Sequence, residues 1–144
     1  MSKFKLGLFA TLLGFSVNVF SQENSPLIGA WKMIKLEASV GGKMVEVPYT
    51  GQLIITDSHT LSAQAMDLNE NAAPTAFTMG GYEALYGSID IDDHLSQFDV
   101  TVESSLVRNL IGRKLQRKFS ITGSTMVLSP LDDKEGWRVT YKRY

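Results

Sequence analysis

Short segments of alternating apolar and polar residues are the feature that most constrains the fold of this 144-residue chain. From Pro26 onward they follow one another closely, separated by turns rich in Gly, Asp, Ser and Asn. Beyond residue 21, no stretch of about 11 residues or more has the 3.6-residue apolar period of an amphipathic helix. The chain is therefore expected to be all-β.

Nine strands are predicted, and most neighbours in sequence are joined by a tight turn. Gly41-Gly42 is typical of a hairpin turn, whereas Asp67–Gly81 is a long connection of the kind that often covers a binding site. Consecutive hairpins favour an up-and-down antiparallel β-barrel, which also removes exposed sheet edges. The predicted strands are Leu27–Val40, Lys43–Val47, Gln52–Thr56, Thr60–Met66, Tyr82–Ile91, Leu95–Ser104, Arg113–Ile121, Thr125–Ser129 and Gly136–Tyr144.

Residues 1–21 have the pattern of a removable export signal. Lys3 and Lys5 precede an uncharged, mostly apolar stretch, and Val19-Phe20-Ser21 offers a cleavage site before Gln22. The apolar stretch, residues 6–17, falls short of the roughly 20 residues that a membrane-spanning helix needs. We therefore expect a signal peptide (1–21), one barrel domain (22–144), no stable membrane anchor after cleavage, and a periplasmic or secreted protein.

Composition narrows the classes of partner. The chain has 14 Lys+Arg against 15 Asp+Glu, and loss of the signal would remove two lysines and no acid. This acidic balance argues against binding to nucleic acid or to an anionic membrane. There is no Cys, and the two histidines lie in separate predicted turns, so neither a metal site nor a cofactor is expected.

Five blocks of residues resemble, in order, the conserved blocks of the bacterial and fungal lipocalin-like domain family of the calycin group. The resemblance implies an up-and-down barrel that binds a small hydrophobic molecule, with occasional cyclases and isomerases among relatives. The chain departs from the pattern at Leu85 and Ile89, where relatives usually have aromatic residues, and it lacks a histidine on the next strand. The blocks are Gly29-Ala-Trp31, Gly51–Thr56 with Leu61–Met66, Tyr82–Gly87, Asn109–Gly112 with Arg117–Phe119, Gly123 and Leu128, and Tyr141–Arg143.

The first and last strands are expected to meet through Trp31 and Arg143. If the faces that carry these residues point inward, the Arg143 guanidinium can lie over the Trp31 indole as a cation–π contact. The resemblance implies this structural role for the tryptophan of Gly29-Ala-Trp31. We expect Gly29, Trp31 and Arg143 to close one end of the barrel rather than to contact a ligand.

Arg117 is the strongest candidate for a binding residue. It shares a strand face with Leu115 and Phe119, and a buried guanidinium needs an acidic partner. One interpretation is a ligand carboxylate, which a guanidinium binds through two hydrogen bonds. A second is an internal salt bridge with Asp99 or Glu103, and a third is a side chain whose charged end escapes to solvent at the rim.

Four other residues are candidates for the wall of a cavity. Tyr82 and Tyr86 share one strand face and would supply phenol hydroxyls, and Phe98 lies on a neighbouring apolar face. Gln64 is a candidate to bind a ligand carbonyl. Ordinary packing between strands explains the same residues equally well.

Three functions remain open at this point. The first is an exported barrel that binds a small, partly hydrophobic molecule, with a carboxylate as one candidate polar group. The second is a cofactor-free isomerase or cyclase that uses the same cavity. The third is a structural or inhibitory module with a filled interior. An interior cavity of several hundred Å³ favours the first two, and one under about 100 Å³ favours the third.

Overall fold

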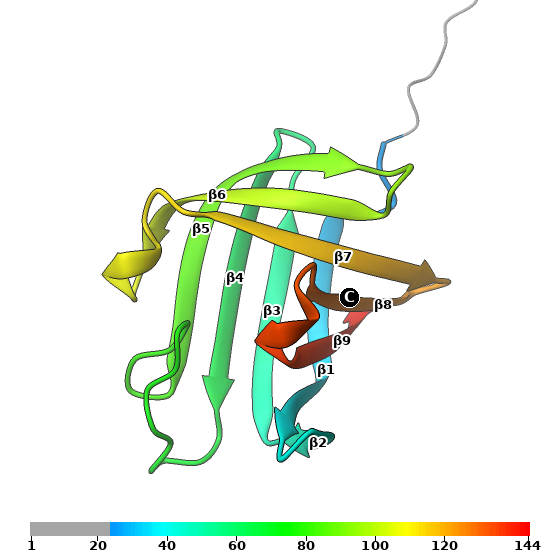
Figure 1. Cartoon of the computed structure of the whole chain (residues 1–144). Coiled ribbons are helices and arrows are strands. Elements are labelled where there is room, and N and C mark those ends of the chain that lie inside the picture. The colour runs from blue at the N-terminus through cyan, green and yellow to red at the C-terminus, as the bar shows by residue number, and fades with distance from the viewer. Residues whose placement is uncertain (1–23) are drawn as a thin grey trace, which may run out of the picture.

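The computed structural model describes residues 24–144, which form nine strands joined mostly by tight turns (Figure 1). The expected signal peptide, residues 1–21, lies outside the described part of the chain. No helix within residues 24–144 is long and apolar enough to cross a membrane. The elements are β1 (Gly29–Val40), β2 (Lys43–Val47), β3 (Tyr49–Ile55), β4 (Thr60–Asp67), β5 (Tyr82–Asp92), β6 (Gln97–Ser105), η1 (Arg108–Leu110), β7 (Lys114–Thr122), β8 (Thr125–Pro130), η2 (Asp133–Glu135) and β9 (Trp137–Arg143).

The strands close into a barrel. They pair antiparallel in the order β2-β1-β3-β4-β5-β6-β7-β8-β9, and β1 also pairs with β9. Eight strands therefore form a closed, up-and-down antiparallel barrel, and β2 is an extra strand on the second half of β1. The predicted all-β barrel is confirmed.

The strand β1 changes neighbours along its length. Its first residues pair with β3, and residues Leu36–Val40 pair with β2. Pro48 separates β2 from β3, because proline has no N–H to donate to the ladder. Both glycines of the predicted Gly41-Gly42 turn have positive φ, 58° and 79°. The β1–β2 hairpin therefore extends one end of the barrel, the end at which the β4–β5 connection also lies (Figure 1).

Side chains fill the opposite end. Leu27, Trp31, Ile55 and Met126 are at most 1 % exposed, and none of them lines the cavity described below. The register of β1 and β9 places Trp31 opposite Arg143 at this end of the barrel. Ala38, further along β1, lies opposite Trp137 at the other end. The barrel thus has a solid end at the start of β1 and a hollow end at the start of β9.

The contact that closes the solid end is the predicted one. The Arg143 guanidinium carbon lies 4.0 Å from the centre of the Trp31 ring, and the Trp31 indole N–H donates to the Leu27 carbonyl at 2.9 Å. Arg143 also donates to the carbonyls of Ile28 (2.8 Å) and Pro26 (2.6 Å). Gly29 has φ of 143°, and a side chain there would collide with the Arg143 guanidinium, so glycine is required on both counts. The expected contact of Arg143 with Trp31 is therefore present, with Gly29 against it; the structural role of the three residues stays a prediction.

Candidate functional site

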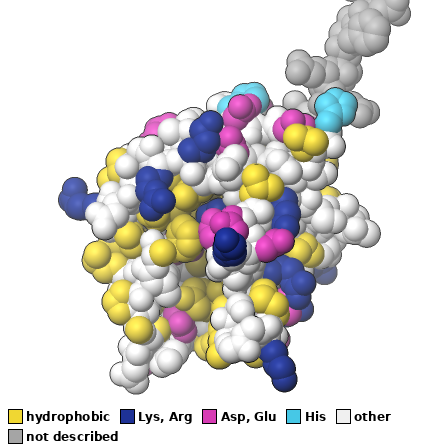
Figure 2. Space-filling view, in the orientation of Figure 1, with side chains coloured by type: hydrophobic (Ala, Val, Ile, Leu, Met, Phe, Trp, Pro, Cys, Tyr) yellow, Lys and Arg dark blue, Asp and Glu magenta, His cyan; other side chains and the backbone are white. Residues whose placement is uncertain are grey.

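A cavity of about 630 Å³ occupies the hollow end of the barrel. Hydrophobic side chains line a hollow on the face shown in Figure 2, with charged side chains beside it. The volume is far above the roughly 100 Å³ expected of a filled barrel and falls in the range of small-molecule sites. The apolar part of its wall includes Met33, Leu36, Leu53, Leu61, Ala63, Leu85, Phe98, Val100, Leu115, Leu128 and Val139.

The long connection between β4 and β5 forms part of the cavity wall, through Thr75, Ala76, Phe77 and Thr78. The hydroxyl groups of Thr75 and Thr78 are 2.8 Å apart, and the backbone N–H of each residue donates to the hydroxyl of the other at 3.1 Å. Thr78 is only 4 % exposed. The long connection therefore lies against the cavity.

Arg117 points into the barrel, as predicted from its strand face. Its side chain is buried, and it lies directly opposite Phe98, which is also buried and lines the cavity. The guanidinium carbon is 4.9 Å from the centre of the Trp137 ring and 5.6 Å from that of Phe77. The two rings meet edge to face at 6.5 Å. Arg117 is therefore held between aromatic side chains from β9 and from the β4–β5 connection.

The acidic partner of Arg117 is Glu135. The prediction that Asp99 or Glu103 pairs with Arg117 is therefore wrong. Nη1 of Arg117 lies 3.5 Å from the Glu135 carboxylate and donates to the Gln116 carbonyl at 2.9 Å. Asp99 instead contacts Lys114 at 3.4 Å. Because Phe98 points inward, strand alternation places Asp99, and with it Glu103, on the outer face. The pair is loose, since the Glu135 side chain is 37 % exposed and also accepts a 3.3 Å hydrogen bond from the Trp137 indole.

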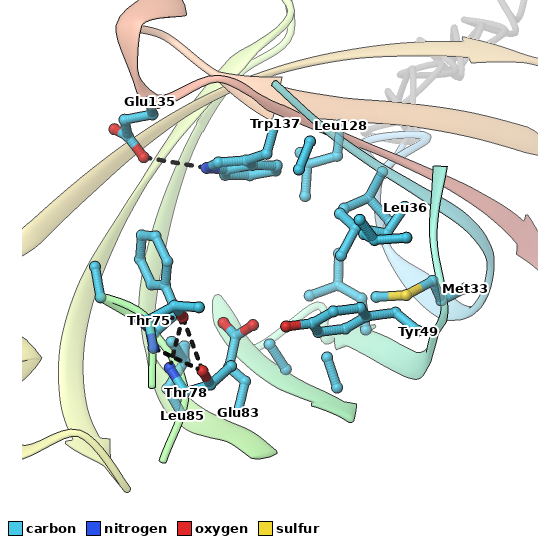
Figure 3. A pocket seen from close by; sticks show the side chains of 18 of the residues that line it. Met33, Leu36, Tyr49, Thr75, Thr78, Glu83, Leu85, Leu128, Glu135 and Trp137 are labelled. Atoms are coloured by element: carbon cyan, nitrogen blue, oxygen red, sulfur yellow. Dashed lines mark hydrogen bonds between the residues drawn. The ribbon is translucent and has the colours of Figure 1, made fainter. Parts of the chain in front are cut away.

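A second acid, Glu83, is half-buried near the start of β5 and faces the cavity (Figure 3). Among residues 24–144, no side chain or backbone N–H donates a hydrogen bond to its carboxylate. Burial raises the pKa of Glu83 to about 7, and the positive charge of Arg117 only partly opposes this shift. Glu83 is therefore a carboxyl group that is close to half ionised at neutral pH.

Two phenols complete the polar part of the cavity. Tyr141 is 5 % exposed, and burial raises its pKa, with Glu83 adding to the shift and Arg117 opposing it. Burial also raises the pKa of Tyr49, which lies beside Asp67. In Figure 3, the Tyr49 hydroxyl and the Glu83 carboxylate face the open space from one side, and Trp137 and Glu135 lie across from them. Both phenols stay neutral hydrogen-bonding groups at physiological pH.

Three residues that were predicted to line the cavity have their side chains on the outer surface. Tyr82 and Tyr86 are 36 % and 53 % exposed, and the exposed Gln64 accepts a 2.7 Å hydrogen bond from Gln52 on the outer face. The predicted alternation on β5 is right, but the inward face carries Leu85 and Ile89 instead. The more apolar face of a barrel strand turns inward because burial stabilises it. Tyr82 and Tyr86 are therefore corrected from cavity wall to outer surface, whereas Gln64 borders the cavity but has its side-chain amide on the outer face.

The same argument that singled out Arg117 would have found Glu83. Glu83 shares its face of β5 with Leu85 and Ile89, so it is a charged residue on an otherwise apolar face. No comparable pattern marks Phe77, because it belongs to an irregular connection, or Glu135, because it lies in a short turn. Only closure of the barrel brings these segments together.

No group of three His, Cys, Asp or Glu side chains within residues 24–144 is arranged to hold a metal ion. The charged and titratable side chains that line the cavity are instead one guanidinium, three carboxylates and two phenols. This set can form charged and neutral hydrogen bonds and, through Glu83, accept or release a proton near neutral pH.

The fold and the cavity define a closed eight-stranded antiparallel barrel with a charged interior. No protein family model matches the chain, and no curated protein matches it. Five chains of solved structures do match. One is the crystal structure of an uncharacterized protein from Bacteroides eggerthii DSM 20697, which is 16% identical, covers 81% of this chain and 98% of its own length, and superposes with a TM-score of 0.45. Membership of the lipocalin-like family stays a prediction from the sequence blocks.

Proposed function

We propose that this protein is a lipocalin-like barrel that binds a small, partly hydrophobic molecule in its interior. The observation that carries the proposal is the cavity of about 630 Å³ at one end of an otherwise well-filled barrel. Its wall is mainly aliphatic and aromatic, with a few polar groups converging on one region, which is the usual composition of a small-molecule site. An interior that served only to stabilise the fold would be expected to be packed, because unfilled space costs stability.

The pairing of Arg117 with Glu135 bears on the carboxylate-bearing ligand suggested by the sequence. A carboxylate that bound Arg117 would have to compete with Glu135 and would lie near Glu83. Like charges in a water-poor cavity repel strongly. The cavity therefore supports a hydrophobic ligand with a polar end, and it disfavours an anionic one.

Binding is tested by native mass spectrometry of the protein purified from its own host, with a variant that fills the cavity. Ala63→Phe places a large side chain on the cavity wall, and Ser88→Phe places the same side chain on the exposed outer face of β5. We expect a co-purifying small molecule on the wild type and on Ser88→Phe, and none on Ala63→Phe. The same mass on all three proteins would contradict binding in the cavity.

Export is part of the same proposal and rests on the pattern of residues 1–21. Mass spectrometry of the protein from the periplasm or the medium should show a chain that begins at Gln22 or within a few residues of it. Recovery of a chain with intact Met1 from the membrane fraction would instead indicate an anchored protein.

The properties of Glu83 favour acid–base catalysis, as in a cofactor-free isomerase or cyclase, as a second candidate function. A carboxyl group with a pKa of about 7 beside Tyr141 and Arg117 is suited to remove a proton from a bound molecule and return it elsewhere. If this is the function, the co-purifying molecule should exchange a carbon-bound hydrogen for deuterium when it is incubated with the protein in D₂O. Glu83→Gln should abolish the exchange, and exchange that survives in Glu83→Gln would exclude this role.

A further inference from the structure

The charged groups that line the cavity do not balance. Within the described chain they are Asp67, Glu83 and Glu135 on the acidic side and Arg117 alone on the basic side. Arg117 and Glu135 form one loose pair, so the remaining interior charge is negative. Because the surrounding wall is mainly apolar, water screens this charge less than it would at a surface.

Glu83 is the acid whose charge has no direct partner. Asp67 accepts a 2.8 Å hydrogen bond from the backbone N–H of Asn69 and lies beside Tyr49. Glu135 contacts both Arg117 and the Trp137 indole. Glu83 receives no hydrogen bond from any residue in 24–144, and its carboxylate is aimed into the empty volume (Figure 3). A half-buried charge without a partner is costly unless a cation or a proton lies beside it.

The three kinds of ligand head group differ in how they fit this interior. An anionic head group would lie among three carboxylates and would have to displace Glu135 from Arg117. A neutral head group would leave an ionised Glu83 unmatched. A cationic head group pairs with the unpaired charge, and its loss of hydration is offset by a charge-assisted hydrogen bond to a carboxylate that the fold already half-buries.

We propose that the ligand is a cationic amphiphile, a primary or secondary amine with an apolar tail, whose ammonium group binds the Glu83 carboxylate. This rests on the proposed function, because it names the ligand class for the same cavity. The tail would lie along the aliphatic wall formed by Leu36, Leu53 and Leu85. Arg117 would not contact the ammonium group but would stay with Glu135, between Phe77 and Trp137.

Protonation of Glu83 should control the affinity. An alkylamine is fully protonated below about pH 9, so between pH 5.5 and 8 the change comes from the protein. Burial raises the pKa of Glu83 to about 7, so at pH 5.5 a proton occupies the site that the ammonium group needs. Affinity should therefore rise with pH by about tenfold or more over this range. The charged and titratable groups around Glu83 are Arg117 on β7, Tyr141 on β9, Tyr49 on β3, Asp67 on β4 and Glu135 in η2.

The test compares three eight-carbon probes that differ only in the head group: n-octylamine, 1-octanol and sodium octanoate. Isothermal titration calorimetry at pH 8 should show octylamine binding at least about tenfold more tightly than octanol, with octanoate weakest, because one charge-assisted hydrogen bond is worth about that much. Octanol binding as tightly as octylamine, or octanoate binding most tightly, would overturn the amine assignment and leave the proposed function standing. Failure of all three probes to bind would contradict both.

Two matched variants separate the role of Glu83 from overall charge. Glu83→Gln keeps the shape of the side chain and removes its charge, and Glu103→Gln makes the same change on the outer face of β6. Glu83→Gln should lower the affinity for octylamine about tenfold or more, remove its pH dependence and leave octanol binding unchanged. Glu103→Gln should change none of these. Equal losses of octylamine affinity in both variants would overturn the proposal, because the attraction would then come from net charge alone.

Discussion

The two ends of the barrel carry the same pair of residue types in different surroundings. At the solid end, Arg143 lies over Trp31 at 4.0 Å and donates to two backbone carbonyls. At the hollow end, Arg117 lies 4.9 Å from the Trp137 ring and contacts a half-exposed acid at 3.5 Å. The first contact closes the barrel, and the second forms part of a cavity wall.

The two arginines differ in whether the groups around each guanidinium leave a charge without a partner. The partners of Arg143 are an aromatic face and neutral carbonyls close to it in space, so nothing around it requires a further charge. Arg117 is surrounded by charged groups that do not balance, since both Glu135 and Glu83 act on it. An arginine–tryptophan contact is therefore not in itself a sign of either a structural or a binding role. The hydrogen bonds and charges around it decide which role it has.

The largest expected effect is at the solid end. Trp31→Ala should lower the free energy of unfolding by about 3–5 kcal/mol, because a fully buried indole is removed. Arg143→Ala should cost less, and the two losses should be sub-additive in a double-mutant cycle measured by chemical denaturation, because the side chains touch. Losses that add in full would show that the two residues do not stabilise each other.

The second effect is a pH dependence at the hollow end. The pKa of Glu83 is raised by folding from an ordinary 4.5 to about 7, so its contribution to stability is present below pH 4.5 and is lost as the pH rises through 7. Glu83→Gln should therefore be more stable than the wild type by about 1–3 kcal/mol at pH 8 and nearly equal to it at pH 4.5. Denaturation curves of both proteins at the two pH values check this, and a constant difference would contradict it.

A third, smaller effect is expected from Arg117→Leu. Removal of the guanidinium leaves Glu135 without its cation, but the partly exposed Glu135 side chain can be rehydrated. The loss of stability should therefore be about 1–2 kcal/mol, below the 3–5 kcal/mol typical of a fully buried pair. A loss as large as that of Trp31→Ala would show that the two ends are equally structural.

The smallest effect tests the outward orientation of a tyrosine. Tyr86 is 53 % exposed, so Tyr86→Ser should change stability by no more than about 0.5 kcal/mol. Binding of octylamine should stay unchanged, because Tyr86 does not line the cavity. Weaker binding, measured by calorimetry, would restore Tyr86 to the site.

The sequence was sufficient for the barrel, because its nine alternating segments and tight turns specify consecutive antiparallel hairpins. Strand alternation also predicted correctly that the Arg117 side chain points inward and that Arg143 contacts Trp31. It was misleading at Tyr82 and Tyr86, because alternation defines two faces of a strand and aromatic residues are favoured on either.

Other features of the cavity depend on long-range closure. The contact of Phe77 with Trp137 joins an irregular connection to the last strand, and no local pattern predicts it. Glu135 reaches Arg117 from a short turn 18 residues further along the chain. The volume of the cavity depends on how all eight strands coil, which the identities of single residues do not determine.

The central claim is that the hollow end holds a carboxylate, that of Glu83, to which no group within residues 24–144 donates a hydrogen bond. NMR titration of protein labelled with ¹³C at the glutamate carboxyl carbons tests this most directly, with Glu83→Gln used to assign the Glu83 signal. We expect that signal to titrate with a pKa of about 7 in the ligand-free protein, and to move to a lower pKa when octylamine is added. A Glu83 pKa near the ordinary 4.5 without ligand would show that its charge is already satisfied, and would contradict the difference drawn between the two ends of the barrel.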